Sequence, residues 1–478
     1  SAIAQLYMED VKGHTQPASC RDGFFGLLFV AHLVLMGYLG MTFGNNAIMH
    51  DEDDLTPPDA SGDLTLAYQN IVKVSIWCGI FATTLSAIAL LVMTVTARRL
   101  VQSALIFAIA LSFAWGTMGI GLSRQSLVPI TGIFALAICV GYAFIVWDRI
   151  PFASSNLATA VTGIRANGGS VLIAFFCQGI ALLWTIYYSV AVVGVYNALK
   201  SGEIVLGSHA ITFVCVMLGI SYYWTYRVLM NVVQVTAAGV IGSWWFKPKS
   251  SCCDESVFIS FFNAIFLSFG SICFGSLVIG PIRFVRQVAA FMRPTRDEST
   301  AFMCFHECVY CIQDCLTRGV DNMYDYFNPW AYTYVGLYSY GLLDAGHNAT
   351  ILFRKRGWSM IVSDDLISNV VMMVSVMIGG LTGCFGLLIQ ANFGFGFTSF
   401  HAPATTAFLI GLSVGLVLSS ILLGIINGAV NAVIVCFAGS PVEFDQQHPL
   451  LSQEMRSAWR EVWPGCMDVV DMKVALGV

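Results

Sequence analysis

Aromatic side chains gather in two stretches of the chain that are otherwise long and apolar. Trp184 and Tyr188 lie in the first stretch, and Tyr223 and Trp224 lie in the second. A quaternary ammonium ion has no N–H group to donate, so electron-rich ring faces hold it better than a carboxylate does. The four rings are therefore a candidate cage for a small organic cation, with ordinary packing between helices as the alternative interpretation.

Polar side chains follow in the second aromatic stretch. Asn231 and Gln234 are candidates for polar contacts along a substrate path. Arg227 is costly at depth in a membrane. It is expected either to form an intramembrane ion pair with Asp344 or to extend its charge to the interface.

No set of residues with catalytic spacing is found. The sequence has no serine elbow, no His and Glu pair at metalloprotease spacing and no glycine loop that could cradle a phosphate. The nearest approach to metal-ligand spacing is His306 beside Cys304 and Cys308. With Cys311 and Cys315 these thiols fit one helix face, either as an apolar stripe or as acylation sites. We expect no enzyme activity, no metal and no cofactor.

Composition places the chain in a membrane. Of its 478 residues, 57% are hydrophobic and only 11% are charged, which is too little charge to cover a water-soluble surface of this size. The net charge is -5 and the 23 Lys and Arg are scattered, so there is no basic face for a nucleic acid. The lipid bilayer is the expected partner.

Long apolar windows predict an all-α, polytopic membrane protein with about ten transmembrane helices. The windows do not alternate apolar with polar residues, as strands of a membrane barrel must. Their expected bounds are 23–43, 73–95, 103–122, 127–147, 170–196, 209–246, 257–280, 329–349, 366–390 and 405–437.

The distribution of Lys and Arg predicts the orientation. Loops rich in these residues stay in the cytosol, and the first expected outer loop, residues 44–67, contains none. We therefore expect a cytosolic tail over residues 1–22, a transmembrane domain over 23–437 and a second cytosolic tail over 438–478. The segment 281–328 is an exception, because it is placed outside yet holds five Arg. Either it lies in the interface, or the spans around it do not both cross.

Several stretches together resemble the choline transporter-like family, solute carrier family 44, including its fungal and protist members. They follow one another in the family's order along most of the chain: Cys20-Arg21-Asp22, Arg149-Ile150-Pro151-Phe152, Tyr223-Trp224-Thr225, Asn231-Val232-Val233, residues 238–246, residues 269–277, the Cys-rich stretch before Phe327-Asn328, residues 331–338 and Val435-Cys436-Phe437-Ala438. Gln234 is a departure, because many fungal-type relatives carry His there.

The resemblance implies a ten-helix transporter in a plasma or organelle membrane, with cytosolic termini. It implies sodium-independent movement of choline or a similar quaternary ammonium, facilitated or driven by the membrane potential. The competing hypothesis is a non-transporting structural or accessory subunit of a larger membrane assembly. Membrane-protein partners or a homodimer are compatible with both.

Overall fold

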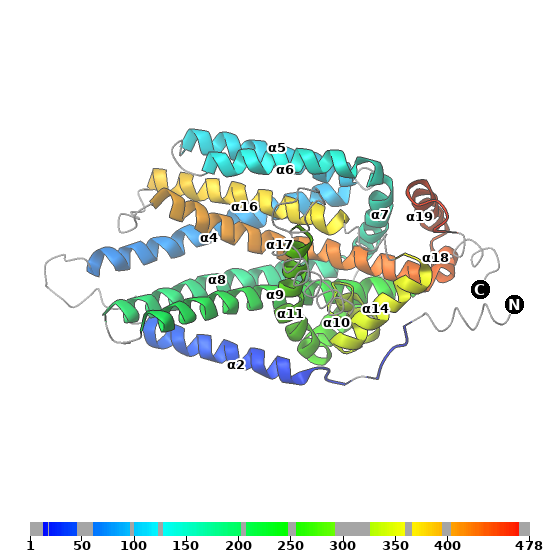
Figure 1. Ribbon diagram of the computed structural model, residues 1–478, viewed down its shortest axis with the longest axis horizontal. Coiled ribbons are helices and arrows are strands. Elements are labelled where there is room, and N and C mark those ends of the chain that lie inside the picture. The colour runs from blue at the N-terminus through cyan, green and yellow to red at the C-terminus, as the bar shows by residue number, and fades with distance from the viewer. Residues whose placement is uncertain are drawn as a thin grey trace, which may run out of the picture.

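The computed structural model describes residues 13–17, 19–44, 61–95, 100–122, 128–201, 207–246, 255–291, 326–358, 366–393 and 403–467. All regular structure in these ranges is helical, which confirms the all-α prediction. The long helices run along one axis of the bundle, and α11 runs across them (Figure 1). The cysteines between residues 304 and 315 and His306 lie outside the described residues.

Eight helices make up most of the bundle. They are α2 (Gly23–Leu39, extended by the π-helical turn η1, Gly40–Gly44), α4 (Ser61–Val95), α5 (Leu100–Leu122), α6 (Val128–Val146), α8 (Gly169–Ser201), α9 (Ser208–Phe246), α16 (Leu366–Phe393) and α17 (Pro403–Gly439). Six helices of the described chain are long and apolar enough to cross a membrane, or up to eight if two bent pairs each count as one span. The protein is therefore a multi-pass membrane protein.

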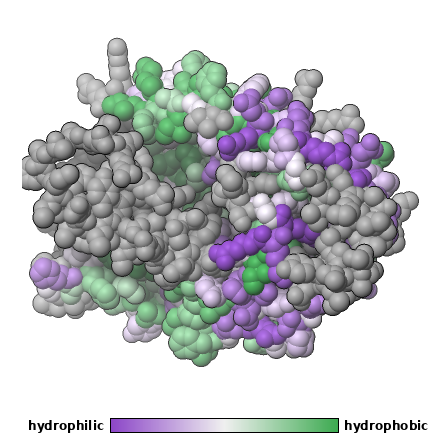
Figure 2. Space-filling view, turned by 45° about the vertical axis from the view of Figure 1, so that its right-hand side comes forward, coloured by the Kyte–Doolittle hydropathy of each residue, from purple (hydrophilic) through white to green (hydrophobic). Residues whose placement is uncertain are grey.

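The surface has the polarity that a bilayer requires. Large apolar side chains such as Phe24, Leu27 and Val34 on α2 are more than two-thirds exposed, as expected for contact with lipid. Figure 2 shows apolar side chains at the top and bottom of the view and polar side chains gathered toward its right-hand side.

Helices α9 and α17 form the centre of the bundle. Both pack against several other helices, and α17 also contacts α16, α4, α8 and α7. Glycines allow the closest approach: a Cβ atom on Gly428 would lie only 2.7 Å from the Cα atom of Gln234 on α9. Small residues at such crossings let helix backbones pack closely in lipid.

Two of the expected spans are broken. The segment expected as one span at 329–349 is two short helices, α13 (Ala331–Tyr338) and α14 (Leu342–Arg356), which corrects the sequence prediction. The chain turns between them because Ser339 adopts the left-handed conformation, with φ of 60°. The other break separates α10 (Glu255–Phe262) and its π-helical turn η3 (Asn263–Leu267) from α11 (Phe269–Phe291), with a bend of 70°.

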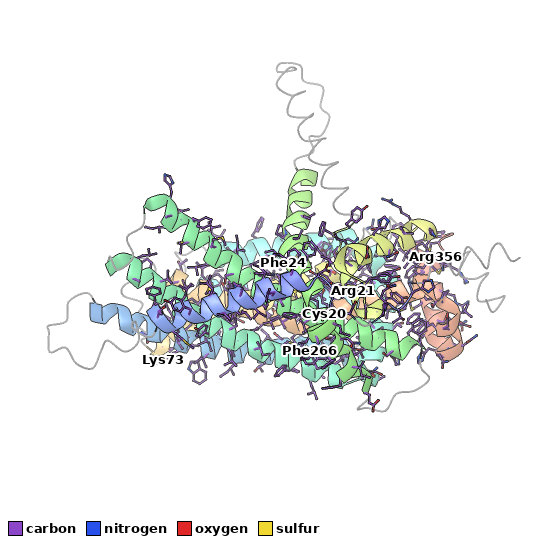
Figure 3. The ribbon with its side chains drawn as sticks, turned by 90° about the horizontal axis from the view of Figure 1, so that it is seen from below. Cys20, Arg21, Phe24, Lys73, Phe266 and Arg356 are labelled. Atoms are coloured by element: carbon purple, nitrogen blue, oxygen red, sulfur yellow. The ribbon has the colours of Figure 1, made fainter. Side chains whose placement is uncertain are left out.

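The described N-terminal residues, 13–17 and 19–22, lie across both breaks. The backbone N–H of Arg21 donates to the carbonyl oxygen of Leu267 at 3.0 Å, and the N–H of Gln16 donates to that of Tyr338 at 2.9 Å. Figure 3 shows Cys20 and Arg21 beside Phe266, and the thiol of Cys20 lies 3.6 Å from the carbonyl oxygen of Phe266. These residues therefore join the two broken spans.

The C-terminal helices pack back onto the bundle at one end. After α6 the chain passes through η2 (Trp147–Arg149) into α7 (Ile150–Ala166), which is bent by 56° from α6. Helices α18 (Pro441–Gln447) and α19 (Pro449–Val462) follow α17, and α19 packs against α7 (Figure 1).

Candidate functional site

The expected aromatic cage comes from two neighbouring helices, α8 and α9, but its four rings do not face one another. Trp184 and Tyr188 lie on α8, and Tyr223 and Trp224 lie on α9. Successive residues of a helix are turned by about 100° from one another, so Tyr223 and Trp224 face different neighbours. The rings form three separate groups.

Trp224 is committed to packing between α2, α9 and α11. Its indole N–H donates to the carbonyl oxygen of Cys273 on α11 at 2.9 Å. Its ring packs edge-on against Phe29 at 5.1 Å and lies 5.3 Å from His32, both on α2. Only 6% of Trp224 is exposed, so its role in this structure is to hold three helices together.

Trp184 lies on the other side of His32. The two rings are 6.3 Å apart, and the indole nitrogen of Trp184 is buried without a hydrogen-bond partner. The imidazole of His32 is held by Ser221 of α9, with 2.6 Å between Nε2 and Oγ. His32 was missing from the predicted site, although a histidine inside the first apolar run is a signal of function in a membrane helix.

Tyr188 pairs with Tyr222, which was not among the four rings of the expected cage. Their ring centroids are 4.9 Å apart, and the Tyr188 hydroxyl donates to the carbonyl oxygen of Leu218 at 2.8 Å. Tyr223 points toward α11, where its hydroxyl fills the space that a Cβ atom on Gly280 would need. Tyr188 and Tyr223 are both partly exposed, so their side chains are not fully covered by protein.

Asn231 links three helices and is fully buried. Its amide donates to the Ser276 hydroxyl on α11 at 2.8 Å and to the Tyr332 hydroxyl on α13 at 2.9 Å. Gln234 lies one turn further along α9. Its side chain is partly exposed and forms no hydrogen bond with any described residue, so it is the freer of the two amides.

The expected ion pair between Arg227 and Asp344 is not formed in the structure. Arg227 lies in the middle of α9, where its Nη1 is 3.4 Å from the Met230 sulfur. Asp344 is exposed in the first turn of α14, immediately after the break at 339–341. The break is the physical reason, because it moves Asp344 off the continuous span on which the pairing depended.

Among the described residues, hydroxyl groups rather than a carboxylate act on the charge of Arg227. Those of Tyr226 and Tyr223 on α9 are within hydrogen-bonding reach, and the third belongs to Tyr332 on α13. The Tyr226 hydroxyl is in turn 3.2 Å from the hydroxyl of Ser420 on α17. Among the described residues, no three His, Cys, Asp or Glu side chains come close enough to hold a metal ion.

A family model described as plasma-membrane choline transporter matches residues 130–441, which include α8, α9, α11 and α17. The chain belongs to the choline transporter family. The match confirms the resemblance found in the sequence, and the family is one of transporters rather than enzymes.

Relatives from fungi and an amoeba agree with the family assignment. The chain is 27% identical to protein PNS1 of Yarrowia lipolytica over 334 residues, which cover 64% of this chain and 56% of that protein. It is 23% identical to PNS1 of Eremothecium gossypii over 453 residues, covering 91% and 78%. A CTL-like protein of Dictyostelium discoideum is 24% identical over 350 residues, covering 73% and 58%. The match thus spans little more than half of the Yarrowia and Dictyostelium proteins.

Proposed function

We propose that this chain carries choline or a related small organic cation across a membrane, without sodium coupling. The observation that carries the proposal is the family match over residues 130–441, which includes both aromatic helices. Movement is facilitated or driven by the membrane potential, which favours entry of a monovalent cation by about 2.3 kcal/mol per 100 mV.

The proposed cation path runs along α8 and α9 and, because Tyr223 points toward α11, also along that helix. The partly exposed rings of Trp184, Tyr188 and Tyr223 supply faces for the ammonium group. Trp224 shapes the site by fixing α9 to α2 and α11. Gln234 supplies a polar contact along the path, and Asn231 acts through the position of Tyr332.

We further propose a plasma or organelle membrane as the location, with both tails in the cytosol. The charge of the connecting segments supports this orientation. The first described residues and α19 also lie at the same end of the bundle (Figure 1).

Uptake of labelled choline into liposomes that contain the purified chain tests the proposal. We expect uptake above that of empty liposomes, faster when the interior is negative than when it is positive. Equal uptake by loaded and empty liposomes under both potentials would reject transport. If the chain then co-purified with membrane proteins at fixed stoichiometry, the accessory-subunit hypothesis would replace the transport hypothesis.

A further inference from the structure

A positively charged side chain lies at the midpoint of the central helix. Helix α9 begins at Ser208 and ends at Phe246, so Arg227 is 19 residues from each end. At 1.5 Å per residue, that places it about 28 Å from either end of the helix. Arg227 therefore cannot reach water beyond the helix ends by extending its side chain.

The guanidinium has no negative partner among the described residues. Its Nη1 lies 3.4 Å from the Met230 sulfur, tyrosine hydroxyls of α9 and α13 act on its charge, and its Nε is buried with no acceptor among the described residues. Tyrosine hydroxyls accept hydrogen bonds but are neutral. A buried cation normally requires an anion as well, because desolvation of the charge is expensive. No described residue therefore compensates the charge of Arg227.

The side chains on the Arg227 face of α9 are not completely covered. Tyr223, Arg227, Met230 and Gln234 share one face of α9, and all four remain partly exposed. Two other helices pack against this face. Tyr223 meets α11, and Met230 and Gln234 meet the glycines of α17, with 3.5 Å between the Met230 Cγ and the Cβ position of Gly424.

We propose that Arg227 binds a small anionic group, either a free chloride ion or the carboxylate of a zwitterionic quaternary ammonium substrate. The fork of N–H donors on a guanidinium suits either group. The nearby ring faces suit a quaternary ammonium, so a molecule with both charges could contact both sets of residues. An anion at Arg227 also removes the repulsion that a permanent cation would meet there.

Binding of a substrate carboxylate at Arg227 rests on the proposed transport function, whereas binding of a free chloride ion does not. Binding is therefore measured without flux. The purified full chain is melted in sodium gluconate, a bulky anion, with chloride, glycine betaine or choline added at equal ionic strength. We expect chloride or glycine betaine to raise the melting temperature by about 2–4 °C, and choline added as its gluconate salt measures the stabilisation that binding of the cation gives without an added anion.

The two sources give different patterns. A response to chloride alone assigns a free ion, and a response to glycine betaine in gluconate assigns a substrate carboxylate. Either response should disappear in Arg227→Gln and persist in Arg460→Gln, a matched change at an exposed arginine on α19. A wild-type protein that responds to neither compound would overturn the proposal, and so would a response that survives in Arg227→Gln.

A second variant covers failure of Arg227→Gln to fold. Arg227→Lys keeps the charge but loses the planar fork, so glycine betaine or chloride should bind about tenfold more weakly than to the wild type. Unchanged affinity in Arg227→Lys would place the anion elsewhere. Choline uptake is measured separately, so loss of transport with an intact anion response rejects only the proposed transport function.

Discussion

The carboxylate of Asp22 accepts a hydrogen bond from the hydroxyl of Ser271 at 2.5 Å, although 249 residues separate the two in the chain. The same oxygen accepts the backbone N–H of Leu342 at 3.0 Å. Asp22 therefore connects the start of α2 with the first turns of α11 and α14, the second halves of the two broken spans. A negative charge at a helix N-terminus is stabilising, because that end carries partial positive charge.

Removal of this link should loosen both breaks. We expect Asp22→Ala to lower the free energy of unfolding by about 1–3 kcal/mol, since two donors lose their acceptor. Asp22→Asn keeps an oxygen acceptor and should cost less. Thermal melting of the purified variants measures both effects. Asp445→Ala is the control, because its ion pair with Arg456 is partly exposed and should be worth at most about 1 kcal/mol. Equal losses at the two positions would contradict the special role of Asp22.

The Asn231 amide should couple energetically to Tyr332. Replacing Asn231 with Leu or Tyr332 with Phe removes the same 2.9 Å hydrogen bond, so the double variant should lose less than the sum of the two single losses. Hydrogen bonds between membrane helices give coupling energies of about 0.6–1.7 kcal/mol. Unfolding in mixed micelles measures the three variants. Strictly additive losses would show that the bond does not contribute to stability.

Helix α19 is held by one fully buried indole. Trp459 packs between Phe152, Trp358 and Phe437, and its N–H donates to the Asn156 side chain at 2.9 Å. The C-terminal segment thereby joins the ends of α7, α14 and α17.

Truncation of this side chain should release α19. We expect Trp459→Ala to weaken the packing of residues 441–467 on the bundle by about 3–5 kcal/mol. Faster proteolysis of these residues measures the loss. Leu450→Ala is the matched control on the same helix, because Leu450 is 78% exposed and its loss should change stability by less than about 0.5 kcal/mol. Equal protease resistance of the two variants would disprove this packing role.

His448 should make the same docking depend on pH. Burial lowers the pKa of His448 below its ordinary value of 6.5, and the ring stacks on Trp244 at 4.5 Å. The undocked segment takes up a proton near pH 6.5, whereas the docked segment does so only at lower pH. Docking is therefore strongest above pH 6.5 and weakens as the pH falls toward the lowered pKa.

A variant that cannot be protonated isolates this effect. His448→Phe should melt at a temperature that varies less between pH 8 and pH 5 than that of the wild type, because the contribution of the buried imidazole is gone. An identical pH dependence in the two proteins would assign the change to other groups.

The sequence predicted the membrane class and most of the long helices, because a bilayer demands long apolar runs whatever their neighbours are. It failed at 329–349, where the run is apolar enough but Ser339 breaks it through backbone geometry that no hydropathy value records. Within the site, the sequence showed which residue types are present, but it did not show which way their side chains point. Tyr223 and Trp224 are adjacent in sequence, yet only contacts with Gly280 and Cys273 reveal that they face different surroundings.

Isolated polar residues were the other missed signal. His32 and Ser276 lie in apolar runs, and each forms a hydrogen bond to another helix. Their partners are 189 and 45 residues away in the chain, so the sequence alone could flag the residues but could not pair them.

The most direct test of the proposed cation site compares choline uptake by the wild type, Tyr223→Phe and Tyr223→Leu in liposomes with a negative interior. The site predicts that Tyr223→Phe keeps most of the affinity, because the ring face remains. Tyr223→Leu should weaken apparent affinity by about 2- to 30-fold, the range for loss of one cation–π contact. An apparent affinity for choline in Tyr223→Leu equal to that of the wild type would contradict a site built from ring faces.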